Sequence, residues 1–132
     1  MINTYSSFLY DFTIDSDNKY LDFKEGAGAE ITAELDTGDF TLEELMQNIE
    51  DAMNDVGGLV YTVSANRTTR IITISVASST MNLLASTGTN VANSVFTTIG
   101  FAASDSGNVT SKAGATAVGT VYEPQYKLQD YV

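Results

Sequence analysis

Large apolar side chains alternate with polar ones along the N-terminal part of the chain. One face of an extended segment carries Phe8, Tyr10, Phe12 and Ile14. A repeat of period two that contains aromatic residues is typical of a half-buried strand. The polar residues 16–19 favour a turn, because Asp and Asn side chains there can bond their own backbone. Alternation resumes over 20–24, so the sequence predicts a first hairpin, followed by a third strand over 31–35.

The clearest element is an amphipathic helix over about 42–55. Its apolar side chains recur at helical spacing and predict one stripe that faces a core, Leu42, Leu45, Met46, Ile49 and Met53. Thr41 and Glu44 have the spacing of a capping box, in which each side chain bonds the other residue's backbone N–H. Gly57 predicts the helix end, because glycine adopts the left-handed cap without strain. The polar side, expected in solvent, holds Glu43, Gln47, Glu50 and Asp51.

The rest of the chain predicts more strands and one further helix. Alternating residues over 59–65 and 70–76, many of them β-branched, predict a second hairpin. The remaining elements follow in order, a short strand over 80–85, a second short helix over about 90–99, a loop over 102–114 and a last strand over 115–122. The predicted fold class is α+β, a mainly antiparallel β-sheet with the main helix across one face.

The chain has 132 residues, a length typical of one domain. We expect a single β-rich domain over 1–122 and an extended C-terminal arm over 123–132. Pro124 favours extended backbone for itself and for the residue before it. Tyr126, Leu128 and Tyr131 are costly to leave in water, so with Pro124 they are the predicted assembly residues. The arm either folds back as an edge strand of its own domain or lies on a neighbouring subunit.

Charge is distributed unevenly along the chain, whose formal net charge is −11. Residues 1–55 hold 14 acidic and two basic side chains, whereas residues 56–132 hold three acidic and four basic ones. Nucleic-acid binding and docking on anionic lipid both need clustered Lys and Arg, so neither is expected. The acidic part is interpreted as a solvated face, with a cation or partner surface as the alternative.

The residues available for catalysis are few, because the sequence contains neither His nor Cys. Thiolate nucleophiles, Cys/His zinc sites and Ser-His-Asp triads are therefore excluded. Acids and amides over 15–22 have part of the spacing of an EF-hand loop, but Tyr20 and Gly26 stand where that loop requires Gly and Glu. A looser cation site or an ordinary turn remain open there. No catalytic, cofactor-binding or metal residue is predicted, no small-molecule substrate is expected, and the chain is not predicted to be an enzyme.

Six short motifs occur in a fixed order along the chain. Residues 18–26 read NKYLDFKEG, 31–41 read ITAELDTGDFT, 52–54 read AMN, 57–63 read GGLVYTV, 86–90 read STGTN and 99–101 read IGF. In this order they resemble a recurrent β-rich module of tailed-bacteriophage virion structural proteins. Residues 124–132 also look like a segment that follows this module in some phage proteins.

The resemblance implies a structural role and no active site. The expected function is that of a tail, tail-tip, neck or fibre-adaptor subunit, which assembles with copies of itself and other virion proteins. Its expected location is the virion, after synthesis and assembly in the host cytoplasm. Two alternatives are a capsid decoration or head-fibre protein and a receptor- or carbohydrate-binding module. The binding module would use exposed aromatic residues, for which the candidates are Tyr20, Tyr122, Tyr126 and Tyr131.

Overall fold

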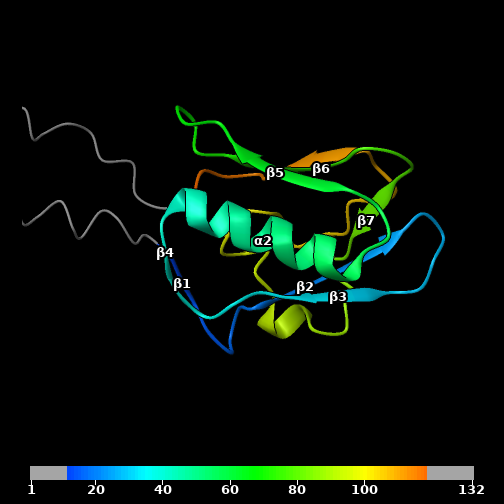
Figure 1. Cartoon of the computed structure of the whole chain (residues 1–132), viewed down its shortest axis with the longest axis horizontal. Coiled ribbons are helices and arrows are strands. Elements are labelled where there is room, and N and C mark those ends of the chain that lie inside the picture. The colour runs from blue at the N-terminus through cyan, green and yellow to red at the C-terminus, as the bar shows by residue number, and fades with distance from the viewer. Residues whose placement is uncertain (1–11, 119–132) are drawn as a thin grey trace, which may run out of the picture.

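Two three-stranded antiparallel sheets form most of the fold in the computed structural model, which describes residues 12–118 (Figure 1). The elements, in chain order, are β1 (Phe12–Ile14), β2 (Tyr20–Glu25), β3 (Ile31–Glu34), β4 (Gly38–Phe40), α2 (Leu42–Val56), β5 (Tyr61–Ala65), β6 (Ile72–Val76), β7 (Met81–Leu83), the 3-10 helix η2 (Val91–Asn93) and β8 (Ser111–Ala113). The sheets have the orders β3-β2-β7 and β5-β6-β8, and β1 pairs with β4 as a separate ribbon. The predicted α+β class with mainly antiparallel strands is confirmed.

Helix α2 lies between the outer edges of the two sheets, beside β3 and β5 (Figure 1). Two asparagines on the helix bond these edges as a neighbouring strand would. The Asn48 carboxamide accepts from the Asp36 backbone N–H and donates to its C=O, both at 3.0 Å. Asn54 accepts from the Tyr61 N–H at 2.8 Å and donates to the Tyr61 C=O at 3.1 Å. The helix therefore closes sheet edges with side chains, in addition to packing over the core.

Glu50 was predicted to lie on the solvent side of the helix, and this prediction is wrong. Its Oε1 accepts from the Val63 backbone N–H at 2.9 Å, so this side chain is half-buried and bonds β5 instead of lying in solvent. The capping box is confirmed, with Thr41 and Glu44 each bonding the other's backbone N–H. The apolar stripe is also confirmed, because Leu45, Ile49 and Met53 are fully buried.

Residues 109–113, which end in β8, join the two sheets through β7 and β6, away from the edges that lie beside α2. Val109 exchanges two backbone hydrogen bonds with Met81 of β7, at 2.8 and 2.9 Å. The next residue, Thr110, accepts from the Val76 N–H of β6 at 2.9 Å, and β8 then continues beside β6. The predicted loop over 102–114 thus contains a strand, because the backbone groups of 109–113 find partners on two sheets.

The predicted first hairpin is wrong. β1 pairs with β4, with Phe12 opposite Phe40, whereas β2 pairs with β3 on one edge and β7 on the other. Because both edges of β2 are occupied, none is left for β1. The turn between β1 and β2 is fixed by Asn18, whose side-chain amide donates to the Thr13 carbonyl at 3.0 Å and to the Thr98 hydroxyl at 3.1 Å.

The predicted second helix over 90–99 is wrong, except for the short η2. The Val95 N–H donates to the Tyr20 carbonyl at 2.8 Å, and Ser94 forms a parallel bridge with Tyr20. This bonding alongside β2 interrupts a helical path. Val95 and Ile99 are fully buried, so their spacing indicated burial without a helix. The last predicted strand is also wrong over 115–118, where the N–H groups of Ala115 and Thr116 both bond the Gly100 carbonyl and that of Val118 bonds the Arg70 carbonyl.

The helix ends at Gly57 for a different reason from the one predicted. Gly57 has φ −86° and ψ 160°, which is ordinary extended backbone and not the left-handed cap. A Cβ at this position would lie 2.8 Å from Glu25 Oε2 and 2.9 Å from Tyr61 Cε2. Glycine is required here by the close approach of these two side chains.

Candidate functional site

The predicted assembly residues lie outside the described residues, as do the whole 123–132 arm, the 119–122 part of the last predicted strand, and Tyr122. Of the candidate aromatic residues only Tyr20 is described; it is half-buried, with Lys19 Nζ 5.3 Å from its ring centroid. No helix within 12–118 has the length and apolar character to cross a membrane. Within residues 12–118, the side chains whose roles the structure defines most fully are carboxylates.

Asp22 is a buried carboxylate that binds a distant loop. Only 1% of it is exposed. It accepts from the Thr32 hydroxyl at 2.6 Å, from the Asn90 backbone N–H at 2.6 Å and from the Asn90 side-chain amide at 3.1 Å. A Cβ on Gly88 would lie 2.5 Å from Asp22 Oδ2, so the loop approaches this closely only because residue 88 is glycine.

Glu25, at the end of β2, binds the connection between α2 and β5. It accepts from the backbone N–H groups of Gly58 and Leu59, at 2.9 and 3.0 Å, and from the Tyr61 hydroxyl at 2.6 Å. Burial raises the pKa of Glu25, but these hydrogen bonds outweigh it and hold the pKa below its ordinary value. Burial, followed by the bond to Glu25, raises the pKa of Tyr61.

Asp105 binds a third loop in the same way. It accepts from the backbone N–H groups of Ser86 and Thr87, at 2.8 and 3.1 Å, and from the Thr87 hydroxyl. Burial raises its pKa, and the hydrogen bonds from Thr87 and Ser86 more than compensate, so the pKa lies below the ordinary value. We call Asp22, Glu25 and Asp105 the clamp carboxylates. Each is already engaged by several donors, which suits it to hold a loop and not to transfer protons.

The stretch over 15–22, where a looser cation site and an ordinary turn were both open, is divided in the structure between a turn and β2. Asp15, Asp17 and Asn18 form a tight turn, in which the Asp17 N–H donates to Asp15 Oδ1 at 2.8 Å and the Asp15 N–H donates to Asn18 Oδ1 at 2.8 Å. Asp22 is directed to the Asn90 loop instead. Across residues 12–118, no three acidic side chains lie close enough together to hold a metal ion.

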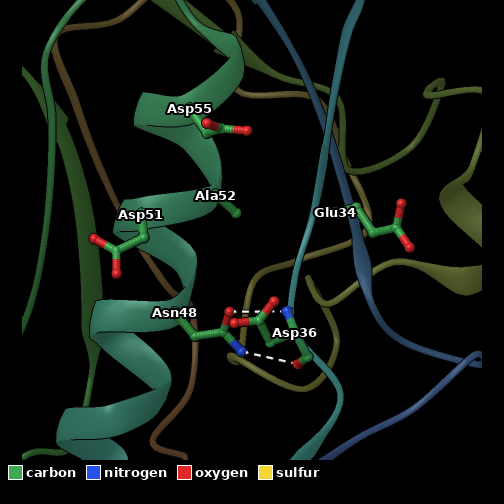
Figure 2. Close-up of a pocket in the computed structure, with 6 residues that line it drawn as sticks. All are labelled: Glu34, Asp36, Asn48, Asp51, Ala52 and Asp55. Atoms are coloured by element: carbon green, nitrogen blue, oxygen red, sulfur yellow. Dashed lines mark hydrogen bonds between the residues drawn. The ribbon is translucent and has the colours of Figure 1, made fainter.

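A second group of acids lines a groove of about 230 Å3 between α2 and β3, which we call the α2–β3 groove (Figure 2). Its lining residues are Glu34, Asp36, Asn48, Asp51, Ala52 and Asp55. The Asn48–Asp36 hydrogen bonds close one end, and Asp55 and Ala52 point from the helix toward β3 (Figure 2). Asp51 accepts from Gln47 Nε2 at 2.8 Å. Sequence reasoning assigned these acids to a solvated face without identifying the groove.

Comparison with known proteins assigns no family to the chain. No family model matches it, and a search of the curated proteins finds no significant match.

Proposed function

We propose that the chain is a structural subunit of a tailed-bacteriophage virion, a tail, tail-tip, neck or fibre-adaptor component that acts by oligomeric assembly. Its partners are copies of itself and other virion proteins. It carries no active site, and its place is in the assembled particle.

The support comes from where the residues of the phage-like motifs lie. Asp22 and Glu25 belong to the NKYLDFKEG motif. Asp22 binds Asn90 of the STGTN motif, and Glu25 binds Gly58 and Tyr61 of the GGLVYTV motif. Motifs that are far apart in the sequence are therefore in direct contact. The motif residues hold the fold together by contacting one another. This favours a module shared with the phage proteins over a chance resemblance.

The engagement of the clamp carboxylates also favours a non-enzymatic role. Glycosidase chemistry needs one carboxylic acid to donate a proton and a second carboxylate nearby. Glu25 and Asp105 have lowered pKa values, which is the opposite of what a proton donor requires. Asp22 is closed off by its donors.

The test is the particle size of the purified full chain, combined with its position in the virion. We expect a ring or cluster of copies by mass photometry and electron microscopy, and antibody labelling at the tail or neck. Deleting residues 124–132 should abolish incorporation of the chain into particles and leave the melting temperature of the monomer unchanged. A strictly monomeric chain that is absent from purified virions would refute the proposal, and labelling over the whole capsid would favour a decoration protein.

A further inference from the structure

Arg70 has a backbone conformation that its residue type rarely adopts. Its φ is 57°, in the left-handed region that favours glycine and, among the other residues, asparagine. The turn between β5 and β6 closes in this conformation, because the Arg70 N–H donates to the Asn66 carbonyl at 2.6 Å and the Asn66 N–H donates to the Ile71 carbonyl at 3.0 Å. Residues strained in this way persist only where the surrounding structure holds them, and they cluster at functional sites.

Arg70 bonds both backbone groups of Val118. The Val118 N–H donates to the Arg70 carbonyl at 2.9 Å, and the Val118 carbonyl accepts from Arg70 Nε at 2.7 Å. One bond uses the main chain of Arg70 and the other uses its side chain, so a short side chain at position 70 would lose the second bond. We call this pair of bonds the Arg70–Val118 anchor.

Val118 is also held by the core of the domain. Its side chain is buried, and a Cβ on Gly100 would lie 3.1 Å from Val118 Cγ1. The N–H groups of Ala115 and Thr116 both donate to the Gly100 carbonyl, at 2.7 and 3.1 Å. The segment that leads to Val118 is therefore fixed at two places, and Val118 is the last residue before 119–132.

Ser79 shows that a left-handed backbone alone does not make an anchor. Within residues 12–118, Arg70 and Ser79 are the two residues other than glycine with positive φ. Ser79 is exposed, and no described residue bonds its side chain. Strain and a contact to a distant segment thus occur together only at Arg70, which makes Ser79 a matched control.

Both ends of the described chain lie where α2 begins (Figure 1). Arg70, which holds Val118, lines a hollow of about 250 Å3 together with Leu42, the first residue of α2. At the other end of the described chain, Phe12 pairs with Phe40, two residues before α2. The segments on either side of the described residues therefore both continue from this end of the molecule.

We propose that Arg70 is the positioning residue of the C-terminal arm: by fixing Val118 at the start of α2, it directs residues 119–132 onto a neighbouring copy of the chain at that end of the molecule. A segment that leaves from a fixed point loses less conformational freedom on binding, which strengthens the contact. Arg70 is then needed for assembly more than for stability, since asparagine would hold the turn with less strain. This inference rests on the proposed assembly function and places the contact of the arm.

The test compares assembly and stability of the full 132-residue chain in single variants, by analytical ultracentrifugation and thermal melts. Arg70→Asn removes the Nε bond and keeps a residue type that tolerates positive φ. We expect it to need about tenfold higher concentration to assemble, because the start of the arm is no longer fixed. Its melting temperature should stay within about 3 °C of wild type, since relief of strain offsets the lost bond.

Two control variants separate the anchor from charge and from strain. Ser79→Asn makes the same exchange at the other left-handed position. Arg67→Asn removes one positive charge from the same turn, where Arg67 pairs with the exposed Glu43 carboxylate and not with Val118. Both should assemble as wild type does. An equal loss of assembly in Arg67→Asn would contradict the proposal, because charge at the turn would then govern assembly.

A second change tests the position of the arm without altering Arg70. Insertion of two glycines after Val118 leaves the Arg70–Val118 anchor intact and changes only where the arm begins. We expect assembly to weaken about tenfold, as in Arg70→Asn, with an unchanged melting temperature. Wild-type assembly of either variant would overturn the proposal. A melting temperature of Arg70→Asn more than about 8 °C below wild type would also overturn it, because Arg70 would then hold the fold.

Failure of this inference is distinguishable from failure of the assembly function. If wild type and Arg70→Asn form particles equally well, the anchor has no role in assembly and the assembly function stands. If the wild-type chain stays monomeric at every concentration and is absent from virions, the assembly function is refuted and this inference with it.

Discussion

The clamp carboxylates and the acids of the α2–β3 groove differ in what surrounds them. Asp22 and Glu25 each accept several hydrogen bonds from loops distant in sequence, whereas Asp36 and Asp55 have exposed side chains. Asp22, Glu25 and the groove acids all belong to the acid-rich residues 1–55. Identical residue types thus hold the fold in one region and leave an exposed acidic surface in the other.

Asp22 should give the largest effect among these acids. Asp22→Ala leaves the Thr32 hydroxyl and the Asn90 backbone N–H without an acceptor in a buried site, and leaves the Asn90 side-chain amide with only the Thr32 hydroxyl, at 3.3 Å. A hydrogen bond to a charged group contributes about 1.5–3 kcal/mol, so we expect the free energy of unfolding to fall by about 3–5 kcal/mol. Urea denaturation measures this loss. The exposed Asp17→Ala is the control and should stay within about 0.5 kcal/mol of wild type.

Gly57→Ala should destabilise the chain although φ is negative at this position. Replacing glycine at a compatible backbone position normally stabilises by about 0.4–1 kcal/mol. Here the new Cβ would meet Glu25 and Tyr61 at under 3 Å, so we expect a net loss of about 1–3 kcal/mol. A rise in melting temperature would show that the clamp tolerates displacement.

Glu25→Gln should have a smaller effect than either change. The amide keeps one oxygen that can accept, but it loses the charge that strengthens the bonds from Gly58, Leu59 and Tyr61. The expected loss is about 1.5 kcal/mol by urea denaturation. Glu43→Gln serves for comparison, because its salt bridge to Arg67 is exposed and contributes little. Equal effects of the two changes would remove the distinction between clamp and surface acids.

Local patterns predicted the elements that depend on neighbouring residues, and failed where distant residues decide. The Thr41–Glu44 capping box and the β5–β6 hairpin follow from short-range spacing. The partner of β1 could not be read in this way, because the competing strands β3 and β7 come later in the chain. Asp22 was assigned to the solvated face, since its partner Asn90 lies 68 residues away. The alternation gave no signal for this: Asp22 lies on the face opposite Leu21 and Phe23, as in a half-buried strand, whereas in the structure both faces of β2 are buried at these residues.

Acid should weaken the clamps formed by Glu25 and Asp105. The folded-state pKa values of Glu25 and Asp105 lie below their ordinary values of 4.5 and 3.8. Their stabilising contribution is thus complete above the ordinary values and is lost as pH falls through the lowered ones. We expect unfolding to be steeper with pH below about 4.5 in the wild type than in Glu25→Gln, measured by circular dichroism. Parallel curves for the two proteins would contradict this linkage.

Asp55→Asn should give the smallest effect and one of opposite sign. The side chain lies at the C-terminal end of α2, where a negative charge is unfavourable, and the structure gives it no compensating donor among the described residues. Removing the charge should therefore stabilise the fold by about 0.3–1 kcal/mol at low salt, with the gain shrinking as salt screens the dipole. Thermal melts at two salt concentrations measure both values. A loss of stability would mean that Asp55 holds the fold as the clamp carboxylates do, whereas a gain would show that Asp55 is not needed for the fold and so separates the two groups of acids.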